Sequence, residues 1–327
     1  MAETFYIDAI CEAMQEEMER DERVFLIGED VGVYGGAFKT SAGLIDKFGA
    51  QRVIDTPISE IAIVGAASGA ALMGMRPIAE MQFIDFITCA YDILVNFAAT
   101  SRYRVGSACP IVVRGPAGGG VHGGPFHSLN PEAMFMNRPG LKIVAPATAY
   151  DAKGLLKAAI RDDDPVVVIE NLPIYKEKGD VPLDPEHVTP IGVARVAREG
   201  TDLTVVAHSY ATVRALHVAE RLGQEDGLSV EVVDLRSLRP LDVETVAASV
   251  AKTHRALCVE EGWPTYGVTA ELAARIQKAC FDDLDAPVER VGMAEVPLPY
   301  AKELEHAAMP NEDRIAAAVR ATAGRTP

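Results

Sequence analysis

The feature that most constrains the fold is a regular alternation of short, wholly apolar segments with helix-forming segments. Such apolar segments predict strands buried on both faces, as in a mostly parallel sheet covered by helices. In the first half of the chain, strands are predicted at residues 24–28, 52–54, 77–80, 111–113, 141–144 and 166–169. Helices are predicted between them, at residues 5–20, 60–75, 89–103 and 150–161.

A second, smaller alternation follows a segment at residues 172–190 that contains four prolines and several charges. This composition is typical of a linker. Beyond it, strands are predicted at 203–208, 229–235, 256–260 and 287–292, and helices at 211–224, 242–252, 265–280 and from about 311. The chain is therefore predicted to form two α/β domains, residues 1–185 and 186–327.

The charge of the chain excludes several classes of partner. Its 327 residues include 31 Lys and Arg against 47 Asp and Glu, a net charge of −16. Nucleic acids and anionic membranes bind basic surfaces, so we expect neither as a partner. Hydrophobic residues make up 49% of the chain, which excludes intrinsic disorder. The acidity instead favours docking on a basic protein partner.

The cysteines and the N-terminus indicate the compartment. The five cysteines are odd in number and none forms a CxxC pair, which predicts a reducing environment without a zinc site or a disulfide framework. The longest apolar run, Ile61–Met75, is shorter than the ~18 residues of a membrane span. Met1–Thr4 has no basic or Arg-rich targeting pattern. We expect a cytoplasmic protein, or one of the mitochondrial matrix or plastid if a transit peptide was removed.

A glycine-rich loop, Gly115–Gly124, follows the predicted strand at 111–113. Three of its glycines satisfy GxGxxG, but Pro125 follows, and no acid falls between Glu132 and Asp151 to bind a ribose. A dinucleotide site is therefore disfavoured. The sequence also lacks GxxxxGK[ST] and GxSxG. The loop is predicted to bring backbone close to a ligand or partner.

Two histidines, His122 and His127, lie in or just after this loop. A metal site would need a third ligand, and only Glu132 is near in sequence, so metal binding is disfavoured. The loop follows a parallel strand, and open α/β sheets bind ligands at that edge. His127 is accordingly either a proton-transfer residue or a solvated surface histidine, and the local sequence leaves both readings open.

A second candidate is Glu60, which follows the strand at 52–54 and begins a helix of small and apolar residues. Glu60 could simply complement the helix dipole as a first-turn acid. However, the helix is apolar on all sides, which predicts that it is buried and that the carboxyl group is poorly solvated. Such carboxyl groups are frequent in functional sites.

At this point, several motifs occur together in an order that resembles a known family. They are Gly28–Gly32, Val53–Glu60, Arg76–Glu80, His127-Ser128, Pro139–Lys142, Asp151–Lys157, Arg161–Glu170, Val233–Leu238 and Pro299-Tyr300-Ala301. Over essentially the whole chain, they resemble the β subunit of the E1 component of 2-oxo acid dehydrogenase complexes, a thiamine-diphosphate-dependent decarboxylase.

The resemblance implies an N-terminal pyrimidine-binding α/β domain with a mostly parallel sheet and a C-terminal transketolase-type α/β domain. In the family, the β subunit holds the aminopyrimidine of thiamine diphosphate, and the α subunit holds the diphosphate and Mg²⁺ through a GDG…NN motif. This sequence contains no GDG. The resemblance therefore implies an α₂β₂ heterotetramer whose active site is shared between chains, and a lipoyl-bearing E2 acyltransferase as a further partner.

The resemblance also assigns site residues. Glu60 would hydrogen-bond N1′ of the pyrimidine, Phe86 would pack on its ring, and Gln82 lies in the same segment. His127 would line the substrate channel and act in the lipoyl step. A structural K⁺ would bind backbone carbonyls of Ile111, Ala159, Asp162 and Asp164. Glu295 is the nearest match to the acidic groups that dock E2.

The substrate is left open between pyruvate and a branched-chain 2-oxo acid. The pattern from His122 to Ala133 and Gln82-Phe83 resemble branched-chain members, whereas Leu129-Asn130 departs from the family pattern. Two other hypotheses share the architecture: an acetoin dehydrogenase β subunit, and a catalytically idle scaffold that only docks E2.

Overall fold

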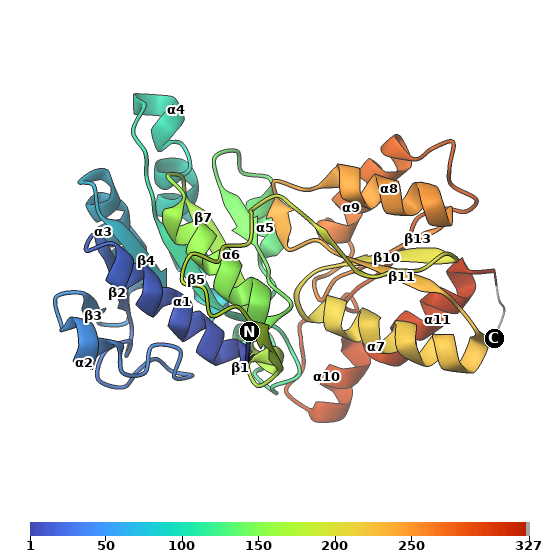
Figure 1. Ribbon diagram of the computed structural model, residues 1–327, viewed down its shortest axis with the longest axis horizontal. Coiled ribbons are helices and arrows are strands. Elements are labelled where there is room, and N and C mark those ends of the chain that lie inside the picture. The colour runs from blue at the N-terminus through green and yellow to red at the C-terminus, as the bar shows by residue number, and fades with distance from the viewer. Residues whose placement is uncertain (325–327) are drawn as a thin grey trace. The chain divides into compact units, whose positions relative to one another are not determined.

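The structure, a computed structural model, describes residues 1–324 and is shown in Figure 1. The chain separates into two compact units. Unit 1 contains Met1–Ala117 and Met134–Ile191; unit 2 contains Gly118–Ala133 and the chain from Gly192 onward. The glycine-rich loop thus belongs with unit 2, although the strand before it belongs to unit 1.

Unit 1 is built on parallel strands that pair in the order β6-β7-β5-β4-β2-β3. Their bounds are β2 (Val24–Gly28), β3 (Val53–Asp55), β4 (Arg76–Glu80), β5 (Val112–Ala117), β6 (Lys142–Val144) and β7 (Val166–Asn171). Nearly every residue of these strands is buried, because helices cover the sheet. The predicted α/β class with a mostly parallel sheet is confirmed.

Three helices of unit 1 pack on this sheet: α1 (Tyr6–Arg20), α3 (Glu60–Leu72) and α6 (Ala149–Arg161). Shorter helices are α2 (Leu44–Phe48), α4 (Ser101–Val105), α5 (Glu132–Met136) and the single turn η4 (Leu172–Ile174). A separate antiparallel pair joins β1 (Ala2–Phe5) to β8 (Lys178–Val181). β8 lies inside the segment expected to be a linker, so that segment is partly ordered as a strand.

The segment predicted as a helix at 89–103 is mostly helical, but it is not one α-helix. The chain instead forms η1 (Ile84–Ala90), a 3₁₀ helix, then η2 (Ile93–Ala98), a π-helix, and then α4. The buried apolar residues Ile84, Ile87 and Ala90 recur every third residue. This spacing matches the three-residue turn of a 3₁₀ helix and not the 3.6-residue turn of an α-helix.

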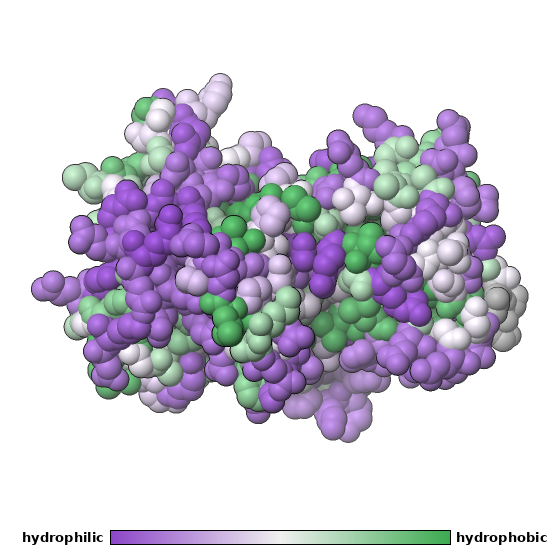
Figure 2. Space-filling model, viewed as in Figure 1, coloured by the Kyte–Doolittle hydropathy of each residue, from purple (hydrophilic) through white to green (hydrophobic). Residues whose placement is uncertain are grey.

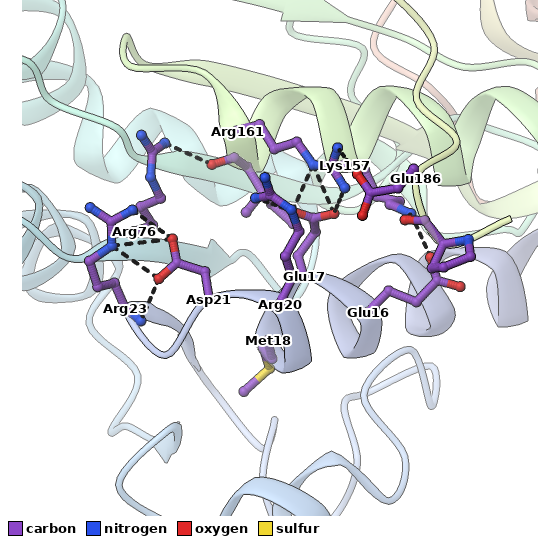
Figure 3. Close-up of polar contacts among 12 residues, drawn as sticks. Glu16, Glu17, Met18, Arg20, Asp21, Arg23, Arg76, Lys157, Arg161 and Glu186 are labelled. Atoms are coloured by element: carbon purple, nitrogen blue, oxygen red, sulfur yellow. Dashed lines mark hydrogen bonds and ion pairs between the residues drawn. The ribbon is translucent and has the colours of Figure 1, made fainter.

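Ion pairs join α1 to α6, which lie side by side (Figures 1 and 3). The Nζ atom of Lys157 lies 2.6 Å from Glu16, and Arg161 binds both carboxylate oxygens of Glu17. Lys157 is fully buried, and losing its carboxylate partner would leave a buried cation without a counter-charge. These ion pairs explain how α1 and α6 can pack together although both helices carry several charged residues.

Unit 2 contains a sheet of order β14-β13-β10-β11-β9, in which only the edge strand β9 is antiparallel. The strands are β9 (Arg195–Arg198), β10 (Leu203–Ala207), β11 (Val230–Asp234), β13 (Ala256–Val259) and β14 (Glu289–Val291), with a short β12 (Ser237–Arg239) elsewhere in the chain. The helices are α7 (Ser209–Asp226), α8 (Val243–Thr253), α9 (Val268–Ala279), α10 (Lys302–Ala308) and α11 (Glu312–Thr322). The core lies where α7 and α11 pack on β10, β11 and β13.

Hydrophilic residues cover much of the face shown in Figure 2, with apolar residues between them. Among residues 1–324, no helix is both long enough and apolar enough to cross a membrane.

Candidate functional site

The candidate site of unit 1 is built where β2, β3 and β4 end. Because these strands are parallel neighbours, the residues that follow them gather at one edge of the sheet. Asp55, the last residue of β3, accepts hydrogen bonds from the backbone N–H groups of Gly32 (2.6 Å) and Val33 (3.4 Å). A Cβ atom at Gly32 would lie 2.5 Å from the Asp55 carboxylate, so only glycine fits. The turn after β2 is thus fixed to the end of β3.

Glu60 begins α3, directly beyond this edge. Its side chain is half-buried, and within the described residues no hydrogen bond or ion pair joins its carboxyl group to another group. A carboxyl group that is held in place but lacks a partner within the chain can bind a group from outside it. The structure therefore leaves Glu60 available for a ligand.

Glu29 is a residue of this edge that the sequence analysis did not single out. It is 8% exposed, and burial, followed by the nearby charges of Glu60 and Asp30, raises the pKa of its carboxyl group. The backbone N–H of Ser59 donates a hydrogen bond to it, which partly offsets the rise. A signal was present in the sequence, because Glu29 directly follows β2, the strand that pairs with β3, and Glu60 lies a few residues beyond the end of β3. The edge thus carries two interacting carboxyl groups, Glu29 and Glu60.

Gln82 and Phe86 follow β4, the next strand of the same sheet, and both are half-buried. Phe86 lies in η1, which packs against α3, the helix that begins with Glu60. The structure therefore brings together the two helices that carry Glu60 and Phe86. Phe83, beside them, packs edge-on against Phe38 with ring centroids 5.2 Å apart.

The expectation that α3 is buried all round is wrong. One face of the helix packs inside unit 1 through residues such as Ile63 and Val64. The opposite face is exposed: Ile61 is 53% exposed and Met73, just past the helix end, is 85% exposed. Gly65 and Gly69 open onto empty space. Residues 1–324 leave this face of α3 uncovered, so an apolar helix remains exposed along one side.

His127 lies in unit 2, directly after the single turn η3 (Gly124–Phe126), and is half-buried. No long helix follows the glycine-rich loop, so the geometry of a dinucleotide-binding turn is absent from these described residues. His122, by contrast, contacts Glu305, with Nδ1 and Oε2 2.7 Å apart. The two histidines of this region therefore have different surroundings.

The four positions predicted to bind K⁺ lie in unit 1: Ile111 directly before β5, Ala159 in the last turn of α6, and Asp162 and Asp164 between α6 and β7. Backbone hydrogen bonds join the segment before β5 to the one before β7. Cys109 N–H donates to the carbonyl of Asp163, and Val166 N–H donates to that of Ile111. The carboxylates of Asp162 and Asp164 are already paired, with Lys142 (2.6 Å) and Arg102 (2.6 Å). Among the described residues, no three His, Cys, Asp or Glu side chains form a metal-binding group. A cation here would have to use backbone carbonyl oxygens.

Glu295 lies in unit 2, in an exposed segment between β14 and α10. Its neighbour Val296 is 45% exposed, whereas Leu298 is buried in a small apolar cluster with Met309. The segment therefore presents one side to solvent and is anchored by the other.

Comparison with known proteins covers both units. A family model described as the transketolase pyrimidine binding domain matches residues 3–177, and one described as the transketolase C-terminal domain matches residues 192–315. A solved structure titled "Split gene transketolase, inactive beta4 tetramer" superposes with a TM-score of 0.78 at 22% identity, covering 98% of this chain and 99% of that one. This likeness supports the fold.

Curated relatives are closer in sequence. The chain is 52% identical over 319 residues to the 2-oxoisovalerate dehydrogenase subunit beta of Bacillus subtilis, covering 96% of this chain and 97% of the relative. It is 47% identical over 315 residues to the pyruvate dehydrogenase E1 component subunit beta of Rickettsia conorii, covering 96% of both. It is also 47% identical to the mitochondrial pyruvate dehydrogenase E1 subunit beta-1 of Arabidopsis thaliana, covering 96% of this chain and 88% of the relative.

These relatives do not favour the acetoin dehydrogenase or idle-scaffold hypotheses. The identities extend along nearly the whole chain, and both halves match the domains that the fold shows. The chain belongs to the family of E1 β subunits of 2-oxo acid dehydrogenase complexes.

Proposed function

We propose that the chain joins an E1 α subunit in an α₂β₂ heterotetramer that oxidatively decarboxylates a 2-oxo acid and transfers the acyl group to the lipoyl group of E2. The 2-oxo acid is pyruvate or a branched-chain acid, since relatives of both kinds are 47–52% identical to this chain. The observation that carries the proposal is the pair of carboxyl groups, Glu29 and Glu60, at the edge of the pyrimidine-domain sheet.

The residues of this edge fit the aminopyrimidine half of thiamine diphosphate. A pyrimidine ring needs a carboxyl partner for a ring nitrogen and an apolar surface for its faces. Glu60 supplies an unpartnered carboxyl group among the described residues, and Phe86 supplies a half-buried aromatic ring on the adjoining helix. When bound, thiamine diphosphate supplies the carbon nucleophile that a 2-oxo acid needs for loss of CO₂.

The role of Glu60 in this scheme is to hold a proton against N1′ of the pyrimidine. Burial and the nearby negative charge of Glu60 raise the pKa of the Glu29 carboxyl group, so this edge carries one acid that is harder to ionise than an ordinary glutamate. Gln82 adds a neutral polar group after β4.

The diphosphate and Mg²⁺ would be held by the α subunit. This chain has no GDG sequence, and its described residues include no group of three potential metal-binding side chains. Phosphates bound by one chain and pyrimidine bound by another require the two chains to associate. The exposed apolar face of α3, which begins at Glu60, is the surface we assign to the α subunit.

Three further assignments follow from the resemblance. K⁺ would bind the carbonyls of Ile111, Ala159, Asp162 and Asp164, each of which has a lone pair beyond the one used in a hydrogen bond. Glu295, on an exposed segment of a chain of charge −16, would dock a basic domain of E2. His127 would act in the lipoyl step. The reducing environment indicated by the cysteines favours the cytoplasm.

The test is a substrate panel with the reconstituted enzyme. The chain is co-expressed with an E1 α subunit, and decarboxylation of pyruvate and of 3-methyl-2-oxobutanoate and cleavage of acetoin are measured with and without thiamine diphosphate. We expect turnover of a 2-oxo acid only when both chains and the cofactor are present. Turnover of acetoin alone, or of none of the three, would contradict the proposal.

A further inference from the structure

We propose that Glu305 is a positioning residue that fixes the glycine-rich loop and thereby holds His127 in its working place. The inference rests on the proposed function, which assigns His127 to the lipoyl step. It extends that function to a residue of α10, close to the C-terminus, that neither the sequence motifs nor the pyrimidine site identify.

Glu305 is a buried carboxylate whose hydrogen bonds all go to the loop or to its own helix. It is 1% exposed. Its Oε1 atom accepts hydrogen bonds from the backbone N–H groups of Gly120 (2.9 Å) and His122 (3.2 Å), and its Oε2 atom lies 2.7 Å from Nδ1 of His122. A buried carboxylate with three donors from one loop fixes that loop strongly, because losing any donor leaves a charge poorly satisfied.

A second contact with the loop comes from Tyr300. Tyr300, of the Pro299-Tyr300-Ala301 motif, packs directly on Gly124. Gly124 has a φ of +67°, and a Cβ atom there would lie 2.2 Å from the Tyr300 ring. Only glycine permits both the backbone conformation and the close approach. The Tyr300 ring of this motif therefore packs against the loop at Gly124.

The segment that follows His127 is fixed as well. Glu132 and His208 are both buried, and their Oε1 and Nε2 atoms lie 3.7 Å apart. His127 therefore lies between two fixed points, the Glu305 and Tyr300 contacts before it and the Glu132–His208 pair after it. All of these residues belong to unit 2. A segment held on both sides presents its histidine in a defined position, which proton transfer and substrate alignment require.

Glu305 could act through His127 or could only stabilise unit 2, and these two roles predict different results. If Glu305 only stabilised unit 2, its removal would affect activity independently of His127. If it acts through His127, its removal should cost little once the His127 side chain has been removed, because residues that act as a unit are not additive.

The test uses the full α₂β₂ enzyme with the variants Glu305→Ala, Glu305→Gln, His127→Ala and the double variant. Glu303→Ala, an exposed acid on the same helix, is the matched control. Reductive acylation of a free lipoyl domain is measured as kcat and KM. We expect Glu305→Ala to lower kcat on the order of 10- to 100-fold, with a smaller effect on KM. Glu305→Gln should retain part of the rate, since its amide oxygen still accepts from the loop N–H groups, and Glu303→Ala should match the unmodified enzyme.

The decisive comparison is the double variant, which should be no slower than His127→Ala alone. An equal fold-loss on removing Glu305 in both backgrounds would overturn the inference while leaving the proposed function intact. Unchanged acylation by His127→Ala would overturn the role of His127 and, with it, this inference. Hydrogen exchange gives a readout apart from activity: the amides of Gly120 and His122 should exchange faster in Glu305→Ala and not in Glu303→Ala. Unchanged exchange would also overturn the inference.

Discussion

The carboxyl groups of Glu29 and Glu60 interact at the edge of the unit 1 sheet, and this repulsion adds to burial in raising the pKa of Glu29. The two residues follow neighbouring parallel strands, so the sheet itself brings them together. Burying Glu29 near the negative charge of Glu60 costs stability, and such costs are typical of functional sites. The arrangement therefore leads to a prediction about stability and activity together.

Glu29→Gln should make the isolated chain more stable at neutral pH and the assembled enzyme slower. In the folded chain, the pKa of Glu29 is raised above its ordinary value of 4.5, so folding takes up a proton and the free energy of unfolding falls as pH rises through that window. Glutamine removes this loss. Urea denaturation from pH 4 to 8 and a decarboxylation assay check both effects. A variant that is less stable than the parent at pH 8 would contradict the account.

Ala66→Arg should prevent assembly with the α subunit without unfolding the chain. Ala66 lies on the exposed apolar face of α3, where an arginine reaches solvent in the isolated chain but would be buried unpaired in an interface. Ala274→Arg, at an exposed position of α9, is the control. Size-exclusion chromatography with the α subunit should show association of the control and not of Ala66→Arg. Normal assembly of both would mean that another surface binds the α subunit.

His208 should make the stability of the chain depend on pH. Burial alone would lower the pKa of His208, but the carboxylate of Glu132 outweighs it and the pKa is raised above 6.5. The pair therefore contributes stability that is fully present below pH 6.5 and is lost as pH rises through the raised value. His208→Gln should flatten the stability profile from pH 6.5 upward, over the range in which the folded-state histidine loses its proton. His217→Gln, which removes an exposed histidine paired with Glu312, should leave the profile unchanged.

Arg114→Met should destabilise unit 1 severely. The Arg114 side chain is fully buried and binds Glu170 (2.5 and 2.6 Å) and Glu80. Removing the cation leaves two buried carboxylates without a counter-charge, which costs about 3–5 kcal/mol. Arg275→Met, which breaks an exposed pair with Glu271 on α9, should cost less than about 1 kcal/mol. Thermal unfolding of the two variants measures the difference; similar melting temperatures would contradict the prediction.

The regular part of the fold could be predicted because its strands are mostly apolar and almost entirely buried. Each of β2, β4, β7, β10 and β13 coincides closely with a predicted strand. The antiparallel strands β1, β8 and β9 could not be found in this way, because they contain charged residues and lie outside the hydrophobic cores. Their pairing depends on partners far along the chain, such as Ala2 with Val181. Local patterns carry no information about such partners.

The candidate site could be predicted only in part, for the same reason. Glu60 was identifiable because a strand end and a helix start flank it in sequence. The contacts of Glu305 with Gly120 and His122 join residues more than 180 positions apart, so no local pattern reports them. The exposed face of α3 was also unpredictable, because an apolar helix looks the same whether its second face packs within the chain or against another one.

The most direct test of the account is the decarboxylation rate of the α₂β₂ enzyme carrying Glu60→Gln. Glutamine matches the size of glutamate but cannot supply a carboxyl proton to the pyrimidine, so the rate should fall by at least about 100-fold. Assembly should be intact by size-exclusion chromatography, and Asp46→Asn, an exposed first-turn acid on α2, should retain full activity. Near-normal turnover by a correctly assembled Glu60→Gln enzyme would contradict the central claim.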